Sequence, residues 1–168
     1  EIINGSSGQF SSDAPLVPVR QFGADRLPPL RTTYVEGGVV TGRNATLVNR
    51  VEARAIADTI QRCLSDKDYD GKTFGVVVLQ GQSQVDVITN ELLDRLTPDQ
   101  WEERRLRVGT PPDFQGDERH VVYLSMVVAP EQNISAMTKT EYQRRFNVAA
   151  SRAQDQMWLF HSRTTDSL

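Results

Sequence analysis

Two arginines seven residues apart carry the clearest chemical signal in this sequence. Arg145 and Arg152 lie in the stretch from Glu141 to Phe160, which starts with helical spacing of apolar residues and ends in a hydrophobic run. Seven residues are almost two turns of an α-helix, so both guanidinium groups are expected to project to nearly the same side. Two fixed cations there favour an anionic ligand. We take Arg152 as the principal functional residue.

The elements that hold these arginines can be predicted from the residues around them. Apolar residues with helical spacing predict a helix packed on a core, and they are Tyr142, Phe146, Ala149 and Ala153. Thr140 is a candidate N-cap with Gln143 as its capping-box partner, and Thr138 is the alternative. Met157 to Phe160 predicts a short buried strand after the helix.

Length and composition limit the class of protein. The 168 residues suit one domain, and 38% hydrophobic with 24% charged residues is typical of a globular protein. No apolar run approaches the roughly 20 residues of a membrane-spanning helix, so a membrane protein is excluded. The net charge of −3 argues against a generally basic nucleic-acid surface. The net charge does not exclude a local basic patch, which would be formed by Arg104, Arg105, Arg107, Arg144 and Arg145.

The start of the sequence differs in composition from the rest. Residues 1–29 are rich in Ser, Gly, Pro and Asn without periodicity, which predicts a flexible lead-in to a domain over residues 30–168. The first residue is Glu, and the opening lacks the basic and apolar regions of a secretory signal. We therefore expect an excised piece of a longer protein.

Several isolated residues that could do chemistry are interpreted as structural. Cys63 is the single cysteine, which fits a reducing cytoplasm, and we expect a buried thiol. His120 and His161 have no metal-ligand spacing between them, so no metal site is predicted. Trp101 and Trp158 could stack on bases, but aromatic residues on predicted helices and strands usually belong to a core.

The order of the predicted elements indicates the fold. The run Thr73–Leu79 is continuously apolar and contains three valines, as expected for a central strand covered on both faces. The other predicted elements are a first strand over 31–35, a helix capped by Asn49, a helix ending at Leu96, a short helix starting at Thr97 and Pro98, and strands over 106–109 and 120–128. This alternation predicts a three-layer, doubly wound α/β fold with a mainly parallel sheet.

Two connections and the arginine helix are expected to form one site. Gln80–Gln84 follows the central strand, and Thr110–Glu118 is a long turn that follows the next strand. In open parallel sheets such segments meet at one rim and bind ligands there. They offer backbone amides, amide side chains, carboxylates and arginines, but no nucleophile with a base. This set suits phosphates and sugars.

Two other motifs are weaker. Gly37–Asn44 is Gly-rich like a phosphate-binding loop, but Arg43 and Asn44 stand where such a loop needs Lys and Ser or Thr, so we expect a surface turn. Asp113 and Glu118 suggest a metal-dependent nuclease, but they are too close in sequence to come from two strands and no lysine follows. The nuclease interpretation ranks last.

The segments Asp113–Ser125 and Gln143–Ala153 resemble motifs V and VI of superfamily 1 helicases. More closely, the chain resembles the second RecA-like domain of the branch that includes the nonsense-mediated-decay helicase, in an AAA_12-like, bacterial form. Asn49–Ala53 and Gln84 agree with that branch, and the resemblance runs from about residue 30 to residue 162.

The resemblance implies a motor domain of an ATP-dependent helicase, which hydrolyses a nucleoside triphosphate. Arg152 would act as the arginine finger on the γ-phosphate. The other residues implied near ATP are Gln115, Gly116, Glu118 and Arg145. Thr110, Gln82 and Gln84 would lie towards single-stranded DNA or RNA, with backbone phosphates rather than bases as the contact.

The family keeps its Walker A and B segments on the first RecA-like domain of the same polypeptide. ATP and Mg²⁺ would therefore be held mainly by that partner, and this piece alone is expected to be inactive. The family usually has an aromatic residue where Gly81 stands, and some members have an arginine where Val85 stands. These departures keep open an alternative, a non-catalytic nucleic-acid-binding or regulatory module with a degenerate motor fold.

Overall fold

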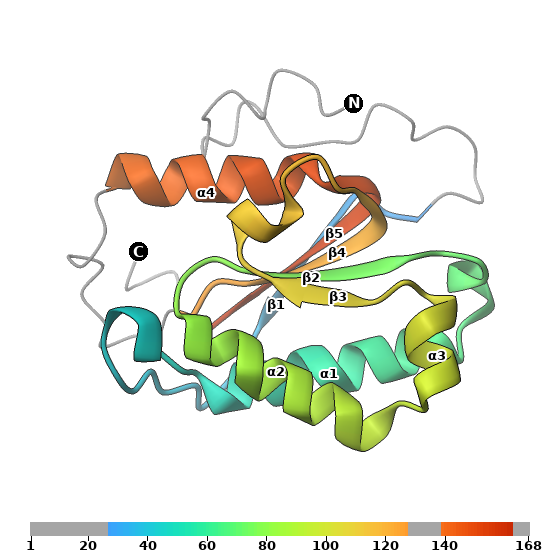
Figure 1. The fold of residues 1–168 in the computed structure, drawn as a ribbon, viewed down its shortest axis with the longest axis horizontal. Coiled ribbons are helices and arrows are strands. Elements are labelled where there is room, and N and C mark those ends of the chain that lie inside the picture. The colour runs from blue at the N-terminus through green and yellow to red at the C-terminus, as the bar shows by residue number, and fades with distance from the viewer. Residues whose placement is uncertain (1–26, 128–138, 163–168) are drawn as a thin grey trace.

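The computed structural model describes residues 27–127 and 139–162 (Figure 1). Most of the predicted lead-in, residues 1–26, and the connection over 128–138 lie outside these ranges. The described residues form one sheet of five strands in the order β1-β5-β4-β2-β3, and all neighbouring strands run parallel. The strands are β1 Leu30–Tyr34, β2 Phe74–Val78, β3 Arg107–Gly109, β4 Arg119–Ser125 and β5 Ala153–His161.

Helices cover both faces of the sheet, which makes three layers (Figure 1). On one face lie α1 (Arg50–Leu64) and α2 (Gln82–Arg95), and on the other lies α4 (Lys139–Ser151), while the short α3 (Pro98–Glu103) stands beside β3. No helix among the described residues is long and apolar enough to cross a bilayer. The predicted doubly wound, RecA-like α/β fold is confirmed.

The central strand β2 shows why the sheet is buried on both sides. All five of its residues are buried, and successive side chains point to opposite faces. Val76 and Val78 pack in the core cluster with α1 and α2, whereas Val77 and the following Leu79 pack in a second cluster with α4. A continuous apolar run is therefore required here, because an alternating pattern would leave one of the two helical layers without a partner.

Local sequence signals set the starts of α1 and α3. The Asn49 side chain accepts a hydrogen bond of 3.0 Å from the Glu52 amide and caps α1 as predicted. Thr97 and Gln100 form a reciprocal capping box at α3, with Pro98 in the first turn. At α4 the predicted cap at Thr140 is wrong, because the helix already begins at Lys139. The alternative, Thr138, lies outside the described residues.

Three predicted boundaries change in ways that affect the site. The last strand, β5, begins at Ala153, so Arg152 is the single turn residue between α4 and β5 rather than part of the helix. Helix α2 begins at Gln82, which shortens the predicted Gln80–Gln84 turn to two residues. The long turn after β3 contains one turn of 3-10 helix, Pro111–Phe114, because proline fits the first positions of a helix.

Candidate functional site

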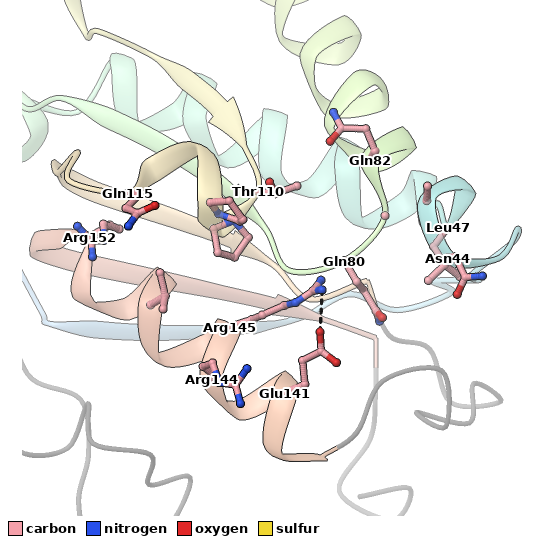
Figure 2. A pocket seen from close by; sticks show the side chains of 15 residues that line it. Asn44, Leu47, Gln80, Gln82, Thr110, Gln115, Glu141, Arg144, Arg145 and Arg152 are labelled. Atoms are coloured by element: carbon pink, nitrogen blue, oxygen red, sulfur yellow. Dashed lines mark hydrogen bonds and ion pairs between the residues drawn. The ribbon is translucent and has the colours of Figure 1, made fainter.

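A pocket of about 670 Å³ lies between α4 and the connections that follow β2 and β3 (Figure 2). Helix α4 contributes Glu141, Arg144, Arg145 and Val148, followed by Arg152. The opposite wall consists of Gln80, Gly81, Gln82, Thr110, Pro111, Pro112 and Gln115, together with Asn44, Ala45 and Leu47. Three arginines and one glutamate make the lining cationic, and the remaining polar groups are mainly amides. Such a lining suits an anionic, hydrogen-bonding ligand.

The pocket runs along the face of the sheet, not along a single rim as predicted. Gln80 and Thr110 follow β2 and β3 at their carboxyl ends, whereas Arg152 and Gln115 precede β5 and β4. Since α4 leads into a parallel strand, it runs against the strand direction and connects the two ends of the pocket. Figure 2 shows Arg152 beside Gln115 at one end and Asn44 at the other.

Arg152 has a fixed main chain, and its side chain lines the pocket. Its amide donates to the Ala149 carbonyl at 3.1 Å, and its carbonyl accepts from the Arg119 amide at 3.0 Å, which ties the turn to the start of β4. Its Nε is buried, yet has no hydrogen-bond partner in the described part of the chain. Buried donors are normally satisfied, so within the described part of the chain the Arg152 Nε still has a hydrogen bond to give.

Arg145 is held in place by its own domain. Its Nη1 donates to the Leu79 carbonyl at 3.1 Å, and its Nη2 forms an ion pair of 3.0 Å with Glu141 one helical turn earlier (Figure 2). These contacts fix the guanidinium beside the end of β2. Arg144 is exposed and adds a third cation to the pocket, although sequence reasoning assigned it only to a basic patch.

The bend at Gln115 and Gly116 is fixed by the residues that follow it. Asp117 forms ion pairs with Arg119 and, at 2.9 Å, with Arg107. Burial acts to raise the pKa of Asp117, but the hydrogen bonds and charges of the two arginines outweigh burial and lower that pKa. The carboxylate is therefore ionised at neutral pH and anchors the bend next to Arg152.

Thr110 begins the 3-10 turn that forms one pocket wall. Its amide and hydroxyl both donate to the Asp113 carboxylate, at 2.8 and 3.0 Å. Asp113 therefore closes its own turn. Among residues 27–127 and 139–162 no group of three or more His, Cys, Asp or Glu side chains could hold a metal ion. This arrangement gives the nuclease interpretation no support.

Three residues predicted to contact a ligand are not part of the pocket lining. Gly116 is exposed at the bend with a φ of 76°, and Glu118 accepts a hydrogen bond of 3.1 Å from Gln154. Gln84 is fully buried. Its Oε1 accepts a hydrogen bond from the Asn49 amide at 2.9 Å, and its Nε2 donates to the Asn49 carbonyl at 3.0 Å. Gln84 therefore has no exposed surface with which to contact nucleic acid, and its amide instead holds the Asn49 main chain.

Sequence reasoning missed the end of the pocket formed by Asn44, Ala45 and Leu47. Asn44 and Ala45 lie in a short 3-10 turn before α1, Asn44–Thr46, and Leu47 follows this turn. Only Asn44 fell within the predicted Gly-rich surface turn. Nothing in their types or spacing indicates a site. They reach the pocket because this turn packs against α2 and Gly81.

Gly81 has a structural reason for its departure from the helicase pattern. Its φ is 91°, and a Cβ atom there would lie 2.5 Å from the Leu47 carbonyl oxygen. A side chain of any size would collide with the turn that ends at Leu47. The pocket therefore has main chain where the resembling family usually has an aromatic ring.

Replacing Gly81 with alanine is expected to destabilise the domain by about 1–3 kcal/mol, because the clash adds to the strain of a positive φ. Gly71→Ala is the matched control, since Gly71 has a φ of 73° but nothing within 4 Å of the added Cβ. Urea unfolding would measure both variants. Equal losses of stability would show that the contact with Leu47 has no effect.

The fold and the pocket together define a RecA-like α/β domain with a pocket lined by three arginines. A family model described as an AAA domain (AAA_12) matches residues 17–164. The chain therefore belongs to this family of AAA domains, and the prediction of an AAA_12-like domain is confirmed. No curated protein matches the sequence.

Among solved structures, one similar chain is described as the C-terminal domain of a possible DNA helicase from Lactobacillus plantarum WCFS1. It shares 17% sequence identity, with a TM-score of 0.49. The similarity covers 84% of this chain and 78% of that one.

Proposed function

We propose that this chain is the second motor domain of an ATP-dependent helicase, with Arg152 as its arginine finger. The observation that supports this most strongly is that Arg152 lines the pocket while its buried Nε has no hydrogen-bond partner among the described residues. Membership of the AAA domain family agrees with a nucleotide-dependent activity. We also propose residues 30–168 as the motor domain and retain the branch of the nonsense-mediated-decay helicase, a bacterial origin and a cytoplasmic location as predictions.

The chemistry of phosphoryl transfer explains why an arginine suits this position. Negative charge spreads over the γ-phosphate oxygens in the transition state, and a fixed guanidinium stabilises it through two parallel hydrogen bonds. The main-chain bonds of Arg152 to α4 and β4 fix the base of the side chain. Gln115 and Arg145 are further candidates for nucleotide contacts, since both line the pocket. Gly116 and Glu118 would act only from outside the pocket.

ATP and Mg²⁺ would be held mainly by a first RecA-like domain of the same polypeptide. The donor set of this pocket agrees with that division, because among the described residues its lining offers arginines and amides for phosphate oxygens, no lysine, and a single carboxylate, that of Glu141. Glu141 is itself paired with Arg145. The chain is thus suited to complete a nucleotide site and not to hold the metal.

Nucleic acid would contact the end of the pocket that lies at the carboxyl ends of β2 and β3. Thr110 and Gln82 line that end and offer uncharged polar groups to a sugar-phosphate backbone. Main chain at Gly81 replaces a stacking ring, so binding would depend on the backbone of single-stranded DNA or RNA. This same feature favours the second candidate, a module that binds nucleic acid without hydrolysing ATP.

A single assay distinguishes the helicase motor from the binding module. The protein that contains both RecA-like domains is expected to hydrolyse ATP with stimulation by single-stranded DNA or RNA, whereas the 168-residue chain alone should not. Phosphate release would be measured with and without oligonucleotide at several salt concentrations. Salt-sensitive binding without ATP hydrolysis in the two-domain protein would contradict the motor and support the binding module.

A further inference from the structure

Val127 adopts an unusual main-chain conformation beside the pocket. It follows β4 by two residues, is fully buried, and has a φ of 54°. A β-branched residue rarely occupies this left-handed region, because its side chain crowds the main chain. Such a conformation persists only where surrounding contacts determine it.

Two side chains from other elements hold the Val127 main chain. Its amide donates to the Glu52 carboxyl oxygen Oε2 at 3.0 Å, and its carbonyl accepts from the Gln80 side-chain amide at 3.1 Å. Glu52 lies in the first turn of α1, and Gln80 lies between β2 and α2. The strained residue therefore connects helix α1 to a residue that lines the pocket.

The described groups that hydrogen bond to the Glu52 carboxyl group are uncharged. It is 0% exposed, and the same Oε2 accepts a hydrogen bond of 2.6 Å from the Ser125 hydroxyl. Burial raises its pKa to about 8, although the hydrogen bonds from Ser125 and Val127 act to lower that pKa. Because burial outweighs these hydrogen bonds, the carboxyl group is held in its neutral form at pH 7.

Gln84 completes the connection. Its side-chain amide donates to the Ser125 hydroxyl at 3.2 Å, and its other bonds reach the main chain of Asn49, the cap of α1. The Ser125 hydroxyl thus accepts from Gln84 and donates to Glu52. These bonds fix the end of β4 against the start of α1, so the position of the Glu52 carboxyl group is itself determined.

We propose that Glu52 is a positioning residue for the pocket, which clamps Val127 in its left-handed conformation so that the Val127 carbonyl holds Gln80 at the pocket wall. Gln80 is only 7% exposed, and its amide has one orientation that satisfies this bond. The consequence for ligand binding rests on the proposed function, because Gln80 neighbours the residues assigned to nucleic acid. The clamp itself does not depend on that assignment.

Amide hydrogen exchange and NMR of the 168-residue chain test the clamp. In Glu52→Ala the Val127 amide loses its acceptor, and its protection is expected to fall about 10- to 100-fold. The Gln80 side-chain amide signals should shift in the same variant. Glu52→Gln retains an acceptor for both donors, so both readouts should stay close to native. Unchanged protection and unchanged Gln80 signals in Glu52→Ala would overturn the proposal.

Two further variants keep the result interpretable. Ser125→Ala removes one hydrogen bond to Glu52. This change is smaller than Glu52→Ala, so the Ser125→Ala variant is expected to fold even if Glu52→Ala does not. Protection of the Val127 amide should fall about threefold to tenfold in Ser125→Ala. Glu91→Ala, which removes an ion pair with Arg95 on the surface of α2, should leave Val127 unchanged. Native protection in Ser125→Ala would count against the clamp.

Binding of a single-stranded oligonucleotide to the two-domain protein separates the two proposals. Glu52→Ala is expected to raise its Kd about tenfold, and Glu52→Gln to leave it unchanged. If the wild-type protein does not bind the oligonucleotide, the proposed function fails, while exchange at Val127 still decides the clamp. If protection falls but the Kd and the Gln80 signals do not change, Glu52 is structural only, and the positioning role is wrong.

Discussion

Replacing Arg152 with alanine is expected to lower the ATP turnover of the two-domain protein about 10³-fold, as for arginine fingers in other nucleotide hydrolases. The loss should appear mainly in kcat, because a finger contacts charge that develops in the transition state. Nucleotide affinity should fall by less than about tenfold, since the partner domain holds most of the triphosphate. Single-turnover hydrolysis and equilibrium binding of a fluorescent ATP analogue would measure the two quantities separately.

Two variants show whether this loss is specific to the guanidinium group. Arg152→Lys keeps the charge but not the planar pair of donors, so it should restore only a small part of the turnover. Arg54→Ala is the matched control, because Arg54 is exposed on α1 and therefore lies on the opposite face of the sheet from α4 (Figure 1). Native turnover in Arg152→Ala would refute the finger role.

The arrangement of the strands and helices could be predicted from the sequence because it depends on residues that are close together in the chain. The apolar run that became β2 has to be covered on both faces, and this property alone requires a parallel strand with helices on either side. Asn49 and Thr97 cap their helices through side chains three residues from their partners, so their roles do not depend on tertiary contacts. The joint presence of Arg145 and Arg152 in one pocket was also predicted from spacing.

The errors concern features that depend on contacts distant in sequence. Arg152 was assigned to a helix, but β5 starts early because its first residues pair with the start of β4. Gln84 was interpreted as a surface residue, yet it is buried because the cap of α1 bonds both ends of its amide. Glu52 looks like an ordinary acidic residue in a first helical turn, and only the packing of α1 on β4 shows that it is buried.

The burial of Glu52 leads to a second large effect, on the pH dependence of stability. Its pKa is 4.5 in the unfolded chain and about 8 in the folded protein. Between these values the unfolded chain releases the proton while the folded protein keeps it, so the free energy of unfolding falls as pH rises. The stabilisation is complete below pH 4.5 and is lost as pH passes about 8. The loss is roughly 3–5 kcal/mol, a large share of the stability of a small domain.

Glu52→Gln is expected to remove this pH dependence, because glutamine has no proton to release. The variant should match the native protein near pH 5 and exceed its stability by roughly 3 kcal/mol or more near pH 8. Urea unfolding of both chains at each pH unit from 5 to 8 gives the difference. Burial also lowers the pKa of His120, which contributes the opposite slope below pH 6.5, but this contribution is common to both chains and cancels. Parallel curves for the two proteins would mean that the folded state already holds Glu52 ionised, in which case the neutral carboxyl group assigned to it is wrong.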